Sequence, residues 1–380
     1  MSKSRPIHVF ICAGESSGDM HGAAVIRSLK KQHPDIQISA VAGSAMRREG
    51  CDVVCPMESL NVMGIVDVLK ALPRIQKIGK DLLAWAAKTR PDVVILVDFP
   101  GFNMRLGEKL RRLGIPVLYY IAPKLWAWGH WRVKRLQRAQ HQLAAILPFE
   151  PNWFSKHAIE AHYVGNPSAV ACQGGWSKAD LKKRLGLTQE QRLLALLPGS
   201  RSSELARHTD VLIQSYQHLK QTMPDLTAVT TQAPSVTDEQ MQPFVDAGIH
   251  VLNRLDEGYA LRADAALAVS GTATLELALW NTPTVLVYQT TAMTMWIGKR
   301  LLGTHCVGLA NIILDDTMIM PELLQEHANV DEIVAAARPL LEKSPEYDAQ
   351  RQAFDDLRCR LGKENPSDKV AKMAFAMVQR

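Results

Sequence analysis

Short apolar runs alternate with amphipathic, helix-length segments along most of this 380-residue chain. Strands that alternate with helices form parallel sheets whose two faces are both covered. The pattern therefore predicts an α/β fold with two doubly wound, Rossmann-like sheets. The expected strands are 7–13, 36–42, 92–97, 116–121 and 143–147 in the first sheet, and 193–197, 226–231, 250–252, 265–269 and 284–288 in the second.

A polar, glycine-bearing stretch over 171–186 interrupts this rhythm and is interpreted as a linker. A length of 380 residues favours two domains, since each can then bury its own core. We expect a first domain over 1–170, a second over 171–349, and a helical end over 350–380. Ligands of doubly wound sheets bind at the carboxyl ends of the strands. Two such edges that face each other would form a cleft.

The segment 193–204, LLALLPGSRSSE, joins an apolar strand, a tight turn and a helix start. Gly199 and Ser200 let the backbone approach an anion closely, and the first N–H groups of the helix point at it. Arg201 adds a positive charge. An ordinary strand-to-helix turn with a solvent-facing Arg is the alternative, because short glycine motifs are common.

A second corner of this type follows at 265–276, AALAVSGTATLE. Its hydroxyls and helix start suit a diphosphate, while Glu276 suits ribose hydroxyls, as in dinucleotide sites. Helix capping explains the same hydroxyls and is compatible with that role. The predicted nucleotide-binding residues are Gly199, Ser200, Arg201, Ser202, Glu204, Ser270, Gly271, Thr272, Ala273, Thr274 and Glu276.

The first half has two carboxylate-bearing corners. The segment 14–19, GESSGD, follows the first strand and lacks the GxGxxG spacing of a dinucleotide site, so Glu15 is expected to bind sugar hydroxyls. Asp98 ends the most apolar strand of this half and precedes a Pro-Gly turn. Such a carboxylate can act as a general base if burial adjusts its pKa. Helix N-capping is the alternative at both corners.

Three tryptophans and several Lys and Arg residues share the segment 119–138. Aromatic and basic side chains can stack on nucleic-acid bases, or they can line a sugar site whose rim binds phosphate. The sugar site is favoured, because one short patch is a small footprint for a polynucleotide. A surface helix with buried tryptophans is the plain structural alternative.

The segment 59–90 combines apolar and basic residues, a pattern typical of docking on anionic bilayers. An apolar face packed on its own sheet is the alternative. The segment 294–302, TMWIGKRLL, is a second candidate of this kind. The residues expected to face the membrane are Val62, Met63, Val66, Val68, Leu69 and Leu72.

Composition narrows the function only slightly. The net charge of +6 suits an anionic substrate, a membrane surface or a nucleic acid equally. The six cysteines are scattered without the spacing of a zinc site, so we expect reduced cytosolic thiols and no metal. The first residues do not resemble a signal peptide, and no apolar stretch reaches about 18 residues. We therefore expect a protein that is neither exported nor membrane-spanning.

Several of these motifs occur together in one order, and together they resemble the lipid-A-disaccharide synthases, glycosyltransferase family 19. The matching motifs are GESSGD, VMGIVDVL, PDVVILVDFPGFN, PKLWAWGHWR, LPFE, LPGSRSSE, SGTATLE and NIILDD with PELLQE. The resemblance implies the glycosyltransferase B arrangement of two Rossmann-like domains, with the final helix crossing back to the first. One departure is Asn166, where the family often has His, so no proton-handling role is carried over to it.

The resemblance also implies the chemistry. UDP-2,3-diacylglucosamine would be joined to 2,3-diacylglucosamine 1-phosphate through a β-1,6 bond, with release of UDP, at the inner face of the inner membrane. An α-linked donor and a β product imply single displacement, with Asp98 as the base and Glu15 as the competitor. The sequence lacks an Asp-x-Asp pair at a strand end, so Arg201 and the two helix starts are expected to bind the leaving group without a metal or other cofactor.

The expected acceptor-binding residues are Glu15, Ser16, Ser17, Asp98, Asn103, Trp126, Trp128 and Arg132. The expected partners are the two lipid substrates and the membrane surface, with no nucleic acid, and a homodimer is left open. Two other function classes remain. A UDP-N-acetylglucosamine epimerase or another sugar transferase would keep the nucleotide half without the apolar patch. A non-enzymatic nucleotide- or membrane-binding module would tolerate loss of Asp98.

Overall fold

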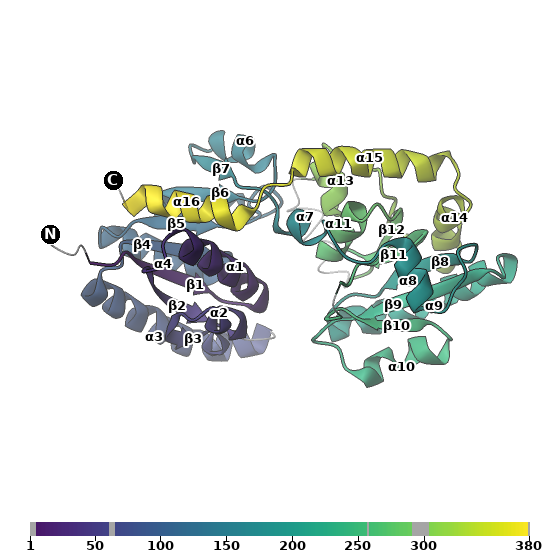
Figure 1. The fold of residues 1–380 in the computed structure, drawn as a ribbon, viewed down its shortest axis with the longest axis horizontal. Coiled ribbons are helices and arrows are strands. Elements are labelled where there is room, and N and C mark those ends of the chain that lie inside the picture. The colour runs from purple at the N-terminus through teal and green to yellow at the C-terminus, as the bar shows by residue number, and fades with distance from the viewer. Residues whose placement is uncertain (1–4, 61–64, 257, 291–303, 379–380) are drawn as a thin grey trace. The chain divides into compact units, whose positions relative to one another are not determined.

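The structure is a computed structural model that describes residues 5–60, 65–256, 258–290 and 304–378, with the side chains of 65–71 left out. It divides the chain into two compact units. The first unit consists of Met1–Pro167 and Lys363–Arg380, and the second of Ser168–Gly362. Each unit is a parallel sheet with helices on both faces (Figure 1). The prediction of two Rossmann-like α/β domains is confirmed.

The first unit contains a seven-stranded sheet in the order β3-β2-β1-β4-β5-β6-β7. Its central strands are fully buried apolar runs, as expected for a parallel sheet covered on both faces. The strands are β1 His8–Ala13, β2 Gln37–Ala42, β3 Asp52–Pro56, β4 Val93–Val97, β5 Val117–Tyr120, β6 Gln142–Ala145 and β7 Ala161–Tyr163. The helices are α1 Ser16–Gln32, α2 Ser44–Arg48, α3 Ile65–Thr89, α4 Pro100–Arg112, α5 Val133–Ala139, α6 Glu150–Ser155, α7 Pro167–Ala171 at the unit boundary, and α16 Pro366–Val378.

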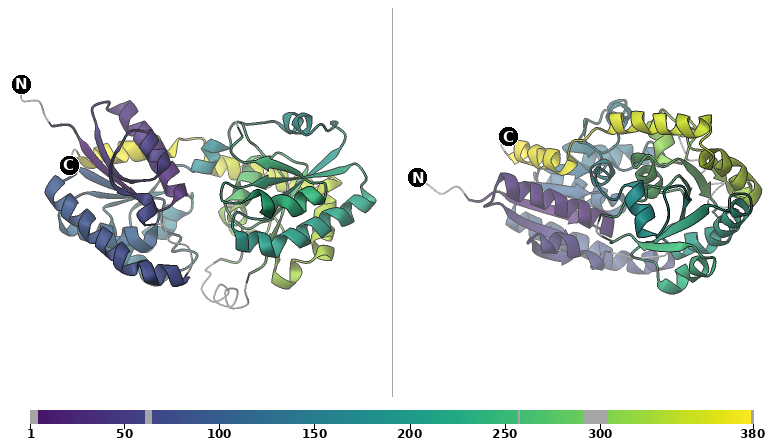
Figure 2. Two further views of the ribbon diagram at one scale, coloured as in Figure 1. Left: turned by 90° about the horizontal axis from the view of Figure 1, so that it is seen from below. Right: turned by 45° about the vertical axis from the view of Figure 1, so that its right-hand side comes forward.

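Helix α16 completes the first unit from the end of the chain. Its apolar side chains Val370, Ala371 and Ala374 are fully buried in the core beneath α1. The Ser28 hydroxyl of α1 donates a 2.7 Å hydrogen bond to Asp368. Helices α1 and α16 therefore cover one face of the sheet, and α3, α4 and α5 cover the other (Figure 2).

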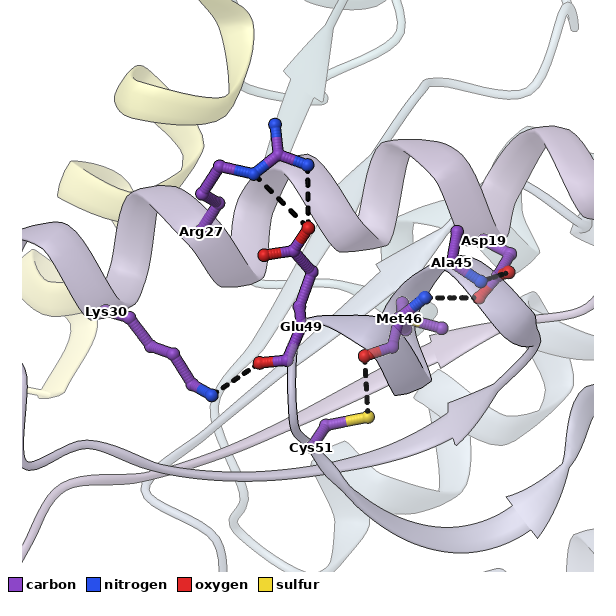
Figure 3. A network of polar contacts seen from close by, with 7 residues as sticks. All are labelled: Asp19, Arg27, Lys30, Ala45, Met46, Glu49 and Cys51. Atoms are coloured by element: carbon purple, nitrogen blue, oxygen red, sulfur yellow. Dashed lines mark hydrogen bonds and ion pairs between the residues drawn. The ribbon is translucent and has the colours of Figure 1, made fainter. Parts of the chain in front are cut away.

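A buried carboxylate ties α1 to α2. Asp19, from the segment 14–19, accepts a hydrogen bond from the Gly43 amide at 2.8 Å. It also accepts hydrogen bonds from the amides of Ala45 and Met46 at 2.7 and 3.2 Å (Figure 3). A β-carbon on Gly43 would lie 2.5 Å from the Asp19 carboxylate, so this contact requires glycine there. Asp19 thus holds the start of α2, a structural role for one carboxylate of that segment.

The second unit contains a six-stranded sheet in the order β10-β9-β8-β11-β12-β13. Helices α9, α10 and α14 share one apolar core with it. The strands are β8 Arg192–Leu197, β9 Leu226–Gln232, β10 His250–Asn253, β11 Ala265–Val269, β12 Thr284–Tyr288 and β13 Glu322–Leu324. The helices are α8 Lys178–Arg184, α9 Ser202–Thr222, α10 Asp238–Asp246, α11 Thr272–Leu279, α13 Leu309–Ile313, α14 Val330–Leu341 and α15 Pro345–Leu361.

The expected linker over 171–186 is partly helical. Helix α8 starts after Ser177, whose side chain accepts a hydrogen bond from the Asp180 amide while Asp180 bonds back to the Ser177 amide. This capping box satisfies the free donors at the helix start, and Leu181 is fully buried beneath it. The interpretation as a linker missed these two features.

None of the helices in the described ranges is both long and apolar enough to cross a membrane.

Candidate functional site

Each sheet has a switch point, where two neighbouring strands send their connections in opposite directions. In the first unit, β1 leads to β2 on one side and β4 leads to β5 on the other. Since β1 and β4 are paired up to Ala13 and Val97, the residues that follow them lie side by side. Ligands of open α/β sheets bind at this position. Glu15 and Asp98 both lie at this first switch point.

The backbone at Asp98 has an uncommon conformation. Asp98 and Phe99 both have left-handed φ angles, 44° and 50°. The turn is held by the Asp98 amide, which donates to the Tyr120 carbonyl at 2.9 Å, and by Asn103 and Tyr119, whose side chains donate to the Asp98 carbonyl at 2.9 and 2.7 Å. Such conformations persist where surrounding contacts enforce them, and they cluster at functional sites.

The N-capping alternative for Asp98 does not describe this turn. Phe99 occupies the N-cap position of α4, and no side-chain capping bond is formed there. The pKa of Asp98 is raised to about 6, first by burial and then by the nearby charge of Glu15, while the Phe99 amide and Lys124 act against them. A carboxylate with a pKa near neutral is suited to general base catalysis.

A cavity of about 740 Å³ opens beside these carboxylates, within the first unit. Gly14, Glu15 and Phe99 line it near the switch point. An apolar part of the wall comes from α3, α4 and the segment before α3, through Leu60, Leu72, Ile75, Leu83, Phe102 and Leu106. Charged residues line the cavity as well, namely Lys80, Arg105, Glu108, Lys109, Arg112 and Arg135. A carboxylate next to a large apolar cavity suits a substrate with a polar head and a hydrocarbon chain.

The structure separates the predicted acceptor-binding residues into two groups. Glu15, Ser16 and Ser17 are exposed at the start of α1, Trp128 is 47% exposed, and Arg132 and Asp98 are partly exposed. These side chains can reach a ligand.

Asn103 and Trp126 are corrections to the prediction. Asn103 is fully buried and supports the turn at Asp98. Trp126 is 4% exposed and donates to the buried Glu150 at 3.0 Å. Both are structural, because their polar atoms face the interior. Asn166, at the position where the resemblance often has His, is also buried, and its side chain donates to the Ile146 carbonyl at 3.0 Å.

Most of the predicted membrane-facing residues cannot be placed. Val62 and Met63 lie outside the described residues, as does the segment 294–302, and the side chains of Val66, Val68 and Leu69 are likewise outside the description. Leu72 is partly buried and lines the 740 Å³ cavity.

The second unit has its own switch point between the paired strands β8 and β11. Both predicted phosphate corners lie there, one after each strand. In the first corner, Gly199 has a φ of 109°. Glu204 turns back to accept hydrogen bonds from the Ser200 and Arg201 amides at 2.8 and 3.2 Å. A carboxylate of the chain thus occupies part of the place where an anion would bind, and the Arg201 side chain is 80% exposed.

In the second corner, Gly271 and Thr272 are exposed at the start of α11. Ser270 is partly buried and its hydroxyl donates to the Val307 carbonyl at 3.4 Å. Thr274 is buried and its hydroxyl donates to the Gly271 carbonyl at 2.8 Å, so it shapes the corner from within.

Arg254 is not among the residues predicted to bind the nucleotide. It pairs with Glu276 next to this corner. Burial raises the pKa of Glu276, and Arg254 opposes that shift. Arg254 directly follows β10, at the carboxyl edge of the same sheet. This position is the signal that could have identified Arg254 from the sequence.

Comparison with known proteins identifies the family of the chain. Residues 9–376 match the family described as lipid-A-disaccharide synthetase. The chain is 33% identical to the lipid-A-disaccharide synthase of Trichlorobacter lovleyi over 382 residues, covering 100% of both chains. It is 36% identical to that of Serratia proteamaculans, covering 94% of this chain and 96% of the relative.

Solved structures with this fold include MurG of Acinetobacter baumannii, with a TM-score of 0.60 and 15% identity over 98% of this chain and 100% of that one. A putative UDP-N-acetylglucosamine 2-epimerase of Listeria monocytogenes has a TM-score of 0.64 and 12% identity over 98% of this chain and 96% of that one. At such identities these two show a shared fold only. The full-length matches confirm the resemblance seen in the motifs: the chain belongs to the lipid-A-disaccharide synthase family, hexosyltransferases of lipid A synthesis.

Proposed function

We propose that the chain transfers 2,3-diacylglucosamine from UDP to the 6-hydroxyl of 2,3-diacylglucosamine 1-phosphate, with inversion and without a metal ion. The position and the pKa of Asp98 are the observations that support this mechanism. It lies at the first switch point and has a pKa of about 6, and Phe99, the next residue, lines the cavity of about 740 Å³. These features support a base that receives an acylated sugar.

In the proposed step, the Asp98 carboxylate takes the proton of the acceptor's 6-hydroxyl while that oxygen attacks the anomeric carbon of the donor. The bond from the anomeric carbon to the β-phosphate oxygen breaks, and UDP leaves with the bonding electron pair. One displacement turns an α-linked donor into a β-linked product. Glu15 remains the competing base, since it shares the switch point.

Groups of the second unit would stabilise the charge that develops on UDP. The exposed Arg201 and the starts of α9 and α11 present positive charge and N–H donors at neighbouring strand ends. The Glu204 carboxylate would leave the Ser200 and Arg201 amides when a diphosphate arrives. Glu276, held by Arg254, is suited to the ribose hydroxyls.

The substrates are acylated, so we propose that the protein works at the cytoplasmic face of the inner membrane. The basic and apolar sequence of 62–80 would meet the bilayer, and Leu72 would link that surface to the cavity. Replacing Val66, Val68, Leu69 and Leu72 by Ser should reduce flotation with anionic vesicles without unfolding. Unfolding would instead show that these side chains belong to the core.

The test is to incubate the purified protein with both lipid substrates and to identify the product. A disaccharide 1-phosphate with a β anomeric proton signal and one equivalent of UDP is expected, at an unchanged rate in EDTA. An α product would exclude single displacement. A rate that is lost in EDTA and restored by magnesium would exclude the metal-free mechanism. Free UDP or an epimerised sugar without disaccharide would favour the epimerase alternative.

A further inference from the structure

A second cavity, of about 480 Å³, shares part of its wall with the first but not the carboxylates Glu15 and Glu108 that line the first. Five cationic residues line it, from α4, from α5 and from the turn before α5, together with two tryptophans and a glycine, and no carboxylate is among its described lining residues. The lining residues are Gly101, Arg105, Trp128, Trp131, Arg132, Lys134, Arg135 and Arg138. We refer to this as the cationic cavity.

Three guanidinium groups of the cationic cavity have no anionic partner in the described parts of the chain. Arg138 pairs with Glu108, but Arg105, Arg132 and Arg135 form no ion pair with any residue that the structure describes. The Arg135 Nε is buried and has no hydrogen-bond partner there. Burial lowers the pKa of Arg132, and the charges of Arg135 and Arg105 lower it further. Cationic groups held close together repel one another, and a buried N–H donor without a partner costs free energy. A bound anion would offset both costs.

The cationic cavity adjoins the apolar cavity. Gly101, Arg105 and Arg135 line both. Gly101 has nothing within 4 Å of the place where a β-carbon would be, so the shared wall is not filled at this point. Trp128 and Trp131 are 47% and 67% exposed, and the Arg132 guanidinium lies 5.9 Å from the centre of the Trp128 ring. The pair of cavities therefore suits one amphiphile with an anionic group and a hydrocarbon chain.

We propose that Arg105, Arg132 and Arg135 bind the phosphate monoester of the acceptor, while the apolar cavity takes one of its acyl chains. This rests on the proposed function and assigns the phosphate to a site. A phosphate monoester carries up to two charges and three acceptor oxygens, which match several guanidinium forks. Phe99, which directly follows Asp98, lines the apolar cavity, and Gly101, in the first turn of α4, lines both cavities, so the 6-hydroxyl of the same sugar is proposed to lie toward Asp98.

The test compares two acceptors, 2,3-diacylglucosamine 1-phosphate and 2,3-diacylglucosamine, for Arg105→Gln, Arg132→Gln and Arg135→Gln. With the phosphorylated acceptor, kcat/KM should fall about tenfold or more for each change, as expected for a lost charge-assisted contact. With the acceptor that lacks phosphate, kcat/KM should change less than about twofold. Arg135→Lys should recover part of the loss, since it keeps the charge but not the fork. Arg48→Gln, an exposed charge on α2 outside both cavities, is the matched control.

Equal losses with both acceptors would overturn the inference, because they would indicate a structural role. Unchanged kinetics with weaker sedimentation on phosphatidylglycerol vesicles would also overturn it, by assigning the cations to bilayer lipids. If the wild-type protein forms no disaccharide, the proposed function fails by itself. Calorimetric binding of 2,3-diacylglucosamine 1-phosphate in detergent then still tests the site, which predicts weaker binding by Arg135→Gln than by Arg48→Gln.

Discussion

At the first switch point the strands β1 and β4 end in two carboxylates, Glu15 and Asp98, whereas at the second the strands β8 and β11 end in hydroxyls, helix starts and Arg201. The topology around the two points is the same, with neighbouring strands that connect in opposite directions. The fold thus supplies a place for a ligand twice, and the residues in the loops after the strands set the charge of each place. A carboxylate is suited to removing a proton, and a cation is suited to holding phosphate.

The two switch points also differ in the burial and the partners of their charged side chains. Asp98 is kept partly buried beside a second carboxylate, which raises its pKa to about 6. Arg201 is largely in water, and the amides beside it are bonded to Glu204. The first unit therefore holds Asp98 at a pKa above its ordinary value. In the second unit, the Glu204 carboxylate occupies part of the place where an anion would bind.

The largest effect is expected at Asp98. Asp98→Asn keeps the size of the side chain and suits the left-handed backbone, but it removes the base. Turnover should fall about 100-fold or more, with UDP affinity nearly unchanged. Parallel measurements of turnover and UDP binding on Asp98→Asn and Glu15→Gln assign the base. A loss confined to Glu15→Gln would identify the other carboxylate.

At the second switch point, Arg201→Ala should weaken UDP binding and lower turnover together. One charge-assisted contact to phosphate contributes about 1.5–3 kcal/mol, which corresponds to roughly 10-fold to 150-fold. Calorimetric titration with UDP measures this effect. Arg207→Ala, six residues later on α9 and also exposed, is the control. Unchanged UDP affinity in Arg201→Ala would move the phosphate site elsewhere.

The pH dependence sharpens the same contrast. The base must be ionised to accept a proton, so kcat/KM should be level above pH 7 and should fall about tenfold per pH unit well below the Asp98 pKa of about 6. UDP binding should not follow this curve. A rate that is constant from pH 5 to pH 8 would contradict the assignment of Asp98 as the base.

The smallest effect is on stability. The folded-state pKa of Asp98, about 6, exceeds its ordinary value of 3.8, so its burial costs free energy wherever the carboxylate is charged. Asp98→Asn should therefore raise the free energy of unfolding of the first unit at pH 8, by on the order of 1–3 kcal/mol. The gain should shrink as the pH falls through 6 and vanish below about 4. Denaturant titrations at pH 8 and pH 5 measure the difference, and a less stable variant at pH 8 would show that the carboxylate is structural.

The central strands could be predicted because they are continuous apolar runs, and Asp98 could be predicted because it ends one. Strands β3, β7 and β13 were missed, since they are short and only partly buried and therefore lack that signature. Which polar residue faces a ligand was harder to infer. Asn103 and Trp126 adjoin the site in sequence, yet their hydrogen bonds turn them inward.

The cationic cavity illustrates a different difficulty. Arg105 belongs to α4, and Arg135 belongs to α5 beyond the next strand. Each looks like an ordinary solvated charge within its own helix. Only the packing of α4 against α5 brings these two side chains to one cavity, so the basic and aromatic pattern of 119–138 could point to Arg135 but no local pattern could join Arg105 to it.

Helix α16 has a consequence for the order of events during synthesis. Part of the core of the first unit, including Val370 and Phe375, is translated after the whole second unit. On the ribosome the second unit can fold as soon as it emerges. The part of the first sheet that α16 covers stays exposed until α16 has been synthesised. The unit whose synthesis begins first is thus completed last. A nascent chain stopped before residue 366 would present that apolar face to chaperones.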